Sequence, residues 1–322
     1  MAALVPDADN IRLAMLGMVD GNGHPYSWSA IFNGYDRGAM AECPYATIPE
    51  YLGAEDPAAL QIEGARVTHI WTDDPADAER VAAASRIPNV VGTATDVIGQ
   101  VDAVIIATDI GHEHVERARP FIEAGLPVFV DKPLVDNEPD LRTFHAWAEE
   151  GKAILSSSAM RYSREFAAAR ERLGEVGELR FLSLSTAKTW ERYGIHALEG
   201  LYPFLGPGFI SARNTGAIDR NIVHLKHERG VDVILVAIKD MYGGFGHLSV
   251  MGTKSDLQAT VSDTFYAFKT QLLSFVDYLR AGERPIPWSQ TVELMKAIIA
   301  GIRSREEGGR EVPLDEISER TA

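Results

Sequence analysis

The sequence predicts an α/β fold with two domains: a parallel-sheet domain over residues 1–155, then an α+β domain over residues 156–322 with an open, mostly antiparallel sheet. Three observations support this prediction. A chain of 322 residues exceeds what one hydrophobic core usually serves. Its first half alternates short apolar runs with helical patterns, which is typical of β-α-β units. In its second half, apolar runs are joined by short turns, which favours antiparallel pairing.

The elements of the first domain follow from its apolar runs. We expect strands at residues 11–16, 67–71, 101–107, 127–130 and 153–155. Helical patterns follow at 115–124, where Gly125 ends the helix, and near 141–150. The boundary between the domains is therefore placed near residue 155.

The second domain has strand-like runs at 179–185, 222–226, 231–237 and 248–251, and helical patterns at 264–280 and 291–305. Pro285 and Pro287 separate the two helices. The segment 33–64 fits neither domain, because connections in such folds usually have about 2 to 6 residues. We interpret it as a surface insertion, with a lid or a subunit contact as the alternative.

Composition excludes several classes of protein. The 31 Lys and Arg residues against 46 Asp and Glu give a formal charge of −15, which opposes binding to nucleic acid or to anionic lipid. Cys43 is the single cysteine, so neither a disulfide within the chain nor a thiolate zinc site is expected. There is no signal peptide pattern and no apolar run of about 18 residues. We expect a cytoplasmic protein with a small-molecule partner.

Glycines follow the first strand and precede a helix. Gly17, Gly21, Asn22 and Gly23 occupy the place where backbone N–H groups and a helix N-terminus bind the pyrophosphate of a dinucleotide. Val19 stands where the second glycine of G-x-G-x-x-G belongs, so the motif is incomplete. A glycine turn that binds nothing is the alternative.

The end of the second strand carries Thr72 and Asp73, at the position where a carboxylate binds the adenosine ribose. No arginine follows closely, so a 2′-phosphate would be repelled and NAD is favoured, with NADP possible. Capping of the next helix by Asp73 or Asp74, ahead of Pro75, is an equal alternative.

Two motifs carry a family resemblance. The run D-A-V-I-I-A-T at 102–108, followed by His114, and the run A-G-L-P-V-F-V-D-K-P-L at 124–134 resemble the glucose-fructose oxidoreductase, inositol dehydrogenase and MocA (Gfo/Idh/MocA) family. The resemblance implies a Rossmann-type first domain and places Lys132 between nicotinamide and substrate, with a cis bond to Pro133. It also implies cofactor contacts from Ala107, Thr108, His114 and Asp131, which replaces the usual glutamate.

The resemblance continues through most of the second domain. The family's D-x-G-x-H-x-x-D helix corresponds to residues 192–199, where Gly194 and His196 match and Arg192 and Glu199 replace the two aspartates. Arg192, His196 and Glu199 share one helix face. The family implies catalysis by Lys132 and His196, and we expect substrate contacts from Arg192, Glu199 and Tyr162.

The charge of Arg192 has two expected effects. Beside His196 it favours a neutral imidazole, as a general base requires. It also favours an anionic substrate, unless an acidic residue from elsewhere neutralises it. For His196 the alternative is a buried structural histidine.

These features together predict NAD-dependent oxidation or reduction of a secondary alcohol of a sugar, cyclitol or sugar derivative, without a metal. Two alternatives stay open: an enzyme that uses NAD transiently for lyase or glycosidase chemistry, and a dinucleotide-binding regulator without turnover. We expect a homodimer or homotetramer that assembles through the C-terminal sheet.

Overall fold

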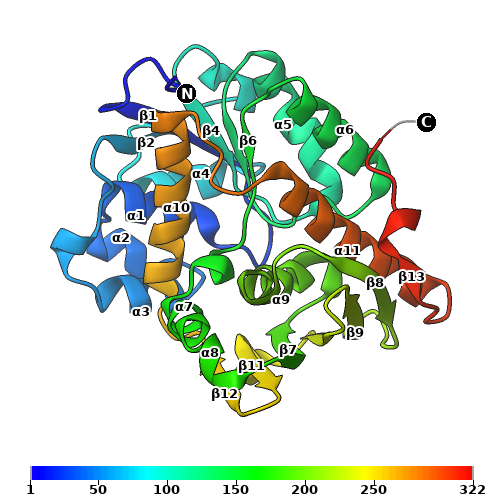
Figure 1. Ribbon diagram of the computed structural model, residues 1–322. Helices are drawn as coiled ribbons and strands as arrows, with labels where there is room; N and C mark the ends of the chain where they lie inside the picture. Colours follow the sequence, from blue (N-terminus) through cyan, green and yellow to red (C-terminus); the bar gives the residue numbers. More distant parts are fainter. Residues whose placement is uncertain (1, 321–322) are drawn as a thin grey trace.

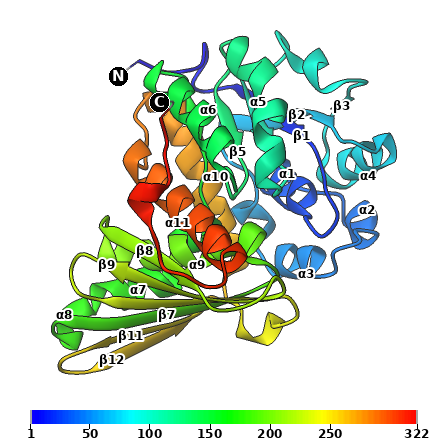
Figure 2. The same cartoon turned by 90° about the vertical axis from the view of Figure 1, so that its right-hand side faces the viewer.

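The computed structural model describes residues 2–320 and contains two sheets with helices packed around them (Figures 1 and 2). The first sheet has six parallel strands in the order β3-β2-β1-β4-β5-β6. Its strands are β1 (Ile11–Leu16), β2 (Ala65–Trp71), β3 (Asn89–Val90), β4 (Ala103–Ile106), β5 (Val128–Val130) and β6 (Ile154–Leu155). The strand order 3-2-1-4-5-6 reverses direction between β1 and β4, so a ligand crevice is expected at the carboxyl ends of these two strands.

Helices cover both faces of this sheet. They are α1 (His24–Asn33), α2 (Arg37–Ala41), α3 (Thr47–Gly53), α4 (Pro75–Ser85), α5 (His114–Glu123) and α6 (Glu138–Glu149). Alternate residues of β1 point to opposite faces: Leu13 packs in the core formed with α1 and α4, whereas Leu16 packs in the core formed with α5 and α6.

The second sheet has seven strands in the order β12-β11-β7-β10-β9-β8-β13. They are β7 (Leu179–Ala187), β8 (Phe209–Asn214), β9 (Arg220–His227), β10 (Asp232–Ile238), β11 (His247–Gly252), β12 (Asp256–Thr260) and β13 (Val312–Pro313). The sheet is mostly antiparallel, as predicted, and β7 and β10 are its parallel pair.

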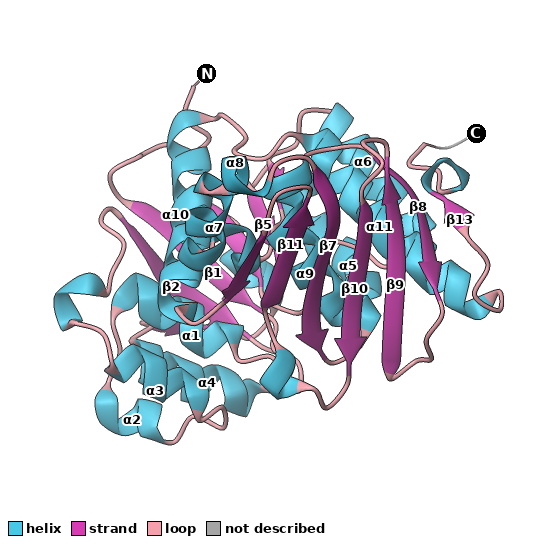
Figure 3. Cartoon of the chain, turned by 60° about the horizontal axis from the view of Figure 1, so that its bottom comes forward, coloured by secondary structure: helices cyan, strands magenta, loops and turns pink. Residues whose placement is uncertain are grey.

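Helices cover one face of the second sheet and leave the other face open (Figure 3). The helices of this half are α7 (Arg164–Glu171), α8 (Leu173–Val176), α9 (Trp190–Leu205), α10 (Thr264–Ala281) and α11 (Trp288–Glu306). Helix α10 returns to the first sheet, where Leu272 and Phe275 are buried in the same core as Leu13. The first core is therefore completed by residues from the second half of the chain.

The insertion at 33–64 is not confined to the surface. It forms α2 and α3, and Met40, Ile48 and Leu52 from these helices are buried; α2 packs on α4, and α3 packs on α1 and α10. The interpretation as a surface insertion is therefore wrong for its apolar residues, because they are the ones that pack into the core. Among residues 2–320, no helix has the length and apolar content needed to cross a bilayer.

Candidate active site and dinucleotide site

Gly17 ends β1 and begins the glycine loop at the crevice. Its φ of +85° lies in the left-handed region, and a Cβ there would come within 2.7 Å of the Thr108 side chain. Only glycine lets the loop run this close to the end of β4. The Thr108 Oγ1 atom is buried without a hydrogen-bond partner in the described part of the chain. A polar group of a bound ligand at this crevice would satisfy it.

Asn22 ties the rest of the glycine loop to the sheet. Its Nδ2 donates to the carbonyl of Ala107 at 3.2 Å and to Asp131 Oδ2 at 3.0 Å, and its Oδ1 accepts from the backbone N–H of His24 at 3.0 Å. Gly21 also has a positive φ, of +75°. The sequence-predicted loop residues therefore lie together at the carboxyl ends of β4 and β5, with Asn22 in a structural role.

The polar residues in the turn after β2 have different roles. Thr72 is buried and donates from Oγ1 to the carbonyl of Asp74 at 2.6 Å, and Asp74 caps α4 by accepting from Ala76 N at 2.9 Å. The capping role therefore belongs to Asp74. Asp73 is left at the strand end, where a ribose-binding carboxylate is expected.

Asp73 has a cation beside it that the sequence did not reveal. Arg117 of α5 donates to both carboxylate oxygens of Asp73, at 3.2 and 3.0 Å, and also donates to Glu113 at 2.9 Å. The expectation that no arginine lies beside Asp73 is therefore wrong: the fold supplies one from 44 residues further along the chain.

An apolar cavity of about 230 Å³ opens beside this pair, at the carboxyl ends of β1, β2 and β4. Leu16, Trp71, Ile106 and Phe121 line it together with Arg117. A flat apolar recess in the switch-point crevice suits the adenine end of a dinucleotide. With the glycine loop and the unpartnered Thr108 hydroxyl, the residues present fit such a cofactor.

Lys132 follows β5 and is almost completely buried, with 2% of its side chain exposed. Its Nζ lies 3.3 Å from Asp109 Oδ2 and 4.5 Å from the centre of the Tyr193 ring. Burial by itself would lower the pKa of Lys132, but the charges of Asp109 and Asp131 raise it overall, so the ammonium form is retained. The expected cis peptide bond between Lys132 and Pro133 is confirmed.

Asp109 is the buried carboxylate that joins the two halves of the site. It pairs with Lys132 and, at 2.5 Å, with Arg192 of α9. Burial would raise the pKa of Asp109, but the neighbouring Lys132 and Arg192 hold it well below its usual range. Arg192 also donates to the carbonyl of Asp20 at 3.1 Å. Of the two alternatives for Arg192, the structure shows neutralisation by an acidic residue from elsewhere in the fold.

His196 of α9 is buried with its Nδ1 2.7 Å from Ser158 Oγ. Burial, and then the charge of Lys132, lowers the pKa of His196 well below its usual value. The groups that favour a neutral imidazole at His196 are therefore its buried surroundings and Lys132, rather than Arg192. His196 and Lys132 both contact the Tyr193 ring, whose centre lies 4.7 Å from the His196 ring centre and 4.5 Å from Lys132 Nζ.

Three other predicted site residues are engaged by protein groups. Glu199 pairs with Arg161, and burial raises the pKa of Glu199. The Tyr162 hydroxyl lies 3.2 Å from Ser274 Oγ and 3.4 Å from Ser157 Oγ.

His114 is the third of these residues. Its ring nitrogens face the carbonyls of Thr108 and Leu134, at 2.9 and 3.0 Å. It therefore connects the loop after β4 with the segment after β5, and both of its ring nitrogens are occupied.

Sequence reasoning missed four residues of the site. Asp109 was detectable, because it follows β4 by the same strand-end rule that singled out Lys132. His24 contacts Asp131 at 2.6 Å and stacks on Trp28 with 4.2 Å between ring centroids. Ser158 and Tyr193 carried no signal in the sequence, because their roles depend on contacts with distant elements.

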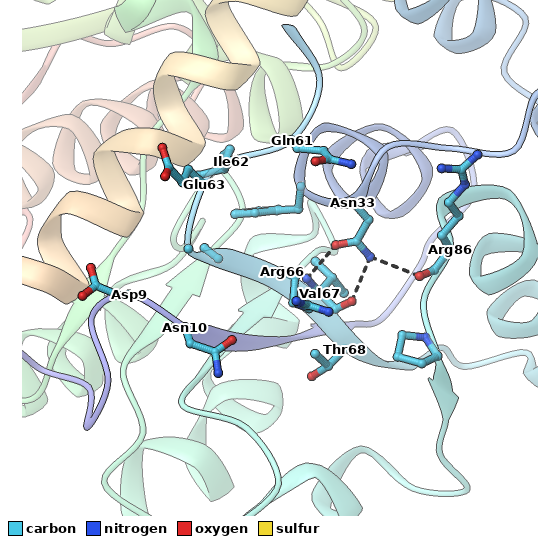
Figure 4. Close-up of a pocket in the computed structure, with 14 residues that line it drawn as sticks. Asp9, Asn10, Asn33, Gln61, Ile62, Glu63, Arg66, Val67, Thr68 and Arg86 are labelled. Carbon is cyan, nitrogen blue, oxygen red and sulfur yellow. Dashed lines mark hydrogen bonds between the residues drawn. The ribbon is translucent and has the colours of Figure 1, made fainter. Parts of the chain in front are cut away.

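A cavity of about 660 Å³ lies at the opposite end of the strands of the first sheet (Figure 4). Its lining includes Asp9 and Asn10 before β1 and Gly64 before β2, so it opens at the amino ends of the strands. Asn33 there binds both the N–H and the carbonyl of Val67, at 3.0 and 2.8 Å. This cavity is remote from Lys132 and His196 and is not the candidate site.

The comparisons with known proteins agree with this geometry. Residues 51–158 match the model of the oxidoreductase family with an NAD-binding Rossmann fold, GFO_IDH_MocA. An inositol 2-dehydrogenase from Rhodococcus erythropolis is 36% identical over 115 residues, which cover 34% of this chain and 33% of that protein. The aligned segment thus spans about a third of that relative.

Solved structures extend the similarity of fold to nearly the whole chain. Myo-inositol 2-dehydrogenase from Lactobacillus plantarum superposes with a TM-score of 0.74 at 15% identity, covering 94% of this chain and 99% of that one. GenD2 from gentamicin A biosynthesis, solved in complex with NAD, gives a TM-score of 0.71 at 19% identity and covers 95% and 96% of the two chains.

The fold and the matched segment define an NAD-binding Rossmann fold in the first half of the chain, followed by a second, mostly antiparallel sheet. More particularly, residues 51–158 match the model of the Gfo/Idh/MocA family, which confirms the resemblance found in the sequence motifs.

Proposed function

We propose that this protein transfers a hydride between NAD and a secondary alcohol of a sugar, cyclitol or related polyol. One observation carries the proposal: a buried ammonium from Lys132 and a buried neutral imidazole from His196 converge on Tyr193. Lys132 Nζ lies 4.5 Å from the centre of the Tyr193 ring, and the rings of His196 and Tyr193 are 4.7 Å apart. The named inositol dehydrogenases among the similar proteins support a polyol substrate.

The two side chains suit complementary roles in this reaction. Ser158 can hold the His196 tautomer in which Nδ1–H donates to Oγ, so that Nε2 accepts the proton of the substrate hydroxyl. The ammonium of Lys132 polarises the carbonyl oxygen that forms, and Asp109 keeps this ammonium charged and in place. Bound NAD would supply the redox chemistry by accepting the hydride.

Gly17, Gly21, Thr108 and Asp73 are the residues we propose to hold the dinucleotide. The loop glycines would bring backbone N–H groups to the pyrophosphate, and Asp73 would accept from the adenosine ribose. Arg117 partly neutralises Asp73 and so reduces its repulsion of a 2′-phosphate, which makes NADP the alternative cofactor.

A substrate screen tests the proposal. Sugars, cyclitols and sugar acids are offered with NAD and with NADP, and both the nicotinamide absorbance and the organic product are followed. Hydride transfer predicts equal amounts of reduced cofactor and oxidised product. Product without net reduced cofactor would instead indicate transient redox chemistry. Absence of any calorimetric response to NAD(H) and NADP(H) at millimolar concentration would rule out the dehydrogenase.

The open face of the second sheet supports a further part of the proposal, association into a homodimer or homotetramer. Ile222 and Met251 on this face have 44% and 41% of their surface exposed, and the neighbouring Ile234, Val236 and Ile238 of β10 are half-buried. An apolar sheet face of this kind usually marks an interface. Light scattering combined with size-exclusion chromatography would find a monomer if this part is wrong.

A further inference from the structure

We propose that the insertion at 33–64 builds a subsite for one uncharged sugar ring beside the reacting centre, so that the substrate is larger than a single polyol. This inference rests on the proposed function. The subsite is a cavity of about 310 Å³ that we call the insertion pocket. Its lining residues are Gly21, Asn22, Gly23, His24, Ser27, Tyr45, Thr47, Ile48, Tyr51, Tyr193, Thr264 and Phe268.

The lining has the chemistry of a carbohydrate site. Tyr45, Tyr51, Tyr193 and Phe268 present aromatic rings, whose electron-rich faces attract the weakly positive C–H groups of a sugar ring. Threonine and serine hydroxyls lie among these rings and can exchange hydrogen bonds with sugar hydroxyls.

The pocket also discriminates by charge and by size. None of the described residues that line it is Asp, Glu, Lys or Arg, and its histidine is already paired with Asp131. The nearest cation, Lys188, is engaged by two lining residues, since its Nζ donates to the carbonyl of Gly21 at 2.8 Å and lies 4.4 Å from the centre of the Tyr193 ring. An anionic ligand would therefore lose its hydration without a free counter-charge in the lining, so a neutral ligand is favoured. The volume lies at the low end of the range of about 300 to 1,000 Å³ for ligand pockets. One sugar ring is therefore the appropriate size.

The wall supplied by the insertion is fixed in place before any ligand binds. A Cβ on Gly23 would come within 2.5 Å of Ile48 and 2.6 Å of Tyr45, which shows how closely the insertion packs on the glycine loop. The Tyr51 hydroxyl is hydrogen-bonded to Ser27 of α1. The Tyr51 ring lies 6.5 Å from Phe268 of α10. A wall held at three points loses little conformational entropy on binding.

Two lining residues connect the pocket to the catalytic residues. Tyr193 lines the pocket and also contacts both Lys132 and His196. His24 lines it as well and binds Asp131, the residue before Lys132. The pocket therefore adjoins the site of hydride transfer, with Tyr193 at the border of both. A substrate that reacts between Lys132 and His196 can place a neighbouring ring in the insertion pocket.

The test measures binding of simple neutral sugars to the NAD-saturated protein by ligand-observed NMR. The probes are the methyl glycosides of glucose, galactose and mannose, with glucuronate as the charged counterpart. The informative variants are Tyr45→Ala and Thr47→Val. Tyr35→Ala is the matched control, because Tyr35 belongs to the same insertion but lines a different cavity.

We expect at least one neutral glycoside to bind, and glucuronate to bind more weakly. Tyr45→Ala should weaken the neutral glycoside by about 5- to 10-fold, because an aromatic contact contributes this much to affinity. Thr47→Val should weaken it less, and Tyr35→Ala should leave it unchanged. The subsite is overturned if no glycoside binds the wild type, if glucuronate binds as well as the neutral sugars, or if Tyr45→Ala and Tyr35→Ala behave alike.

Failure of the subsite can be told apart from failure of the proposed function. If NAD binds and small polyols are oxidised, but Tyr45→Ala leaves the affinity for the glycoside unchanged, only the subsite is wrong. If NAD does not bind the wild type, the dehydrogenase is wrong, and glycoside binding that depends on Tyr45, measured without cofactor, would still support the pocket.

Discussion

Replacing Asp109 by asparagine should destabilise the protein strongly, because this substitution removes one buried charge and leaves two cations behind. Asp109 is 1% exposed, and its partners Lys132 and Arg192 are 2% and 28% exposed. Removing one member of a buried ion pair costs about 3 to 5 kcal/mol. Lys132 dominates this cost, since Arg192 keeps access to solvent and to the carbonyl of Asp20. The asparagine oxygen can still accept a hydrogen bond, so we expect the lower end, about 3 kcal/mol.

Thermal and denaturant unfolding of Asp109→Asn measures this loss, which corresponds to a fall in Tm of about 6 °C for a chain of this size. The control is Asp219→Asn, which breaks an exposed pair with Lys239 and should cost less than about 1 kcal/mol.

The pH dependence provides an independent check. The pKa of Asp109 is depressed in the folded protein, so its stabilisation is present above the unfolded carboxyl value of about 3.9 and is lost as pH falls through the folded value. The difference between wild type and variant should therefore be constant near neutral pH and shrink in acid. If Asp109→Asn unfolds with the same free energy as Asp219→Asn, Asp109 does not neutralise Lys132 and this account of the site is wrong.

Four further predictions concern the reaction and its ligands. Lys132→Met should lower kcat by roughly 10³-fold, in the range that loss of an electrostatic stabiliser produces, while calorimetry finds NAD affinity within a few fold; full activity would refute its role. Because the pKa of His196 is lowered, it stays a neutral base through pH 6.5, so kcat/KM should show no acidic limb there, whereas a limb centred near that pH would contradict the assignment. Arg117→Ala should uncover the charge of Asp73 and raise the Kd of NADP relative to NAD by about tenfold, and an unchanged ratio in calorimetry would exclude Arg117 from cofactor selection. Arg192→Ala should leave the ratio of turnover on a sugar acid to turnover on its neutral parent unchanged, since Asp109 already neutralises Arg192; a fall in that ratio would show that Arg192 anchors an anionic substrate after all.

Local patterns predicted most of the first sheet. The strand Ile11–Leu16 is found at the predicted residues, because an apolar run interrupted only by Arg12 and followed by glycine carries a strong signal. Strand β3 was missed because it has two residues and both are exposed. Strand β12 was missed because Leu257 is its only buried residue. Short or solvated edge strands lack the apolar pattern on which such predictions depend.

The candidate site was predictable only in part. Lys132 and His196 could be found because each belongs to a motif whose own residues lie within a few positions of one another. The ion pairs of the site could not be predicted, because Asp109 and Arg192 are separated by 83 residues and Arg117 lies 44 residues from Asp73. Such pairs depend on how the sheets and helices pack against one another, and local patterns in a single sequence do not predict that packing.

The return of α10 to the first sheet bears on how the chain unfolds. Phe265, Leu272 and Phe275 of this helix are buried in the core of β1, and the carbonyl of Leu279 accepts a hydrogen bond from Leu4 N at 2.8 Å. A fragment ending at residue 155 would lack α10 and would expose the apolar surface that this helix covers. Neither half can therefore lose its structure without uncovering the core of the other. The two sheets should melt in a single cooperative transition rather than as independent domains.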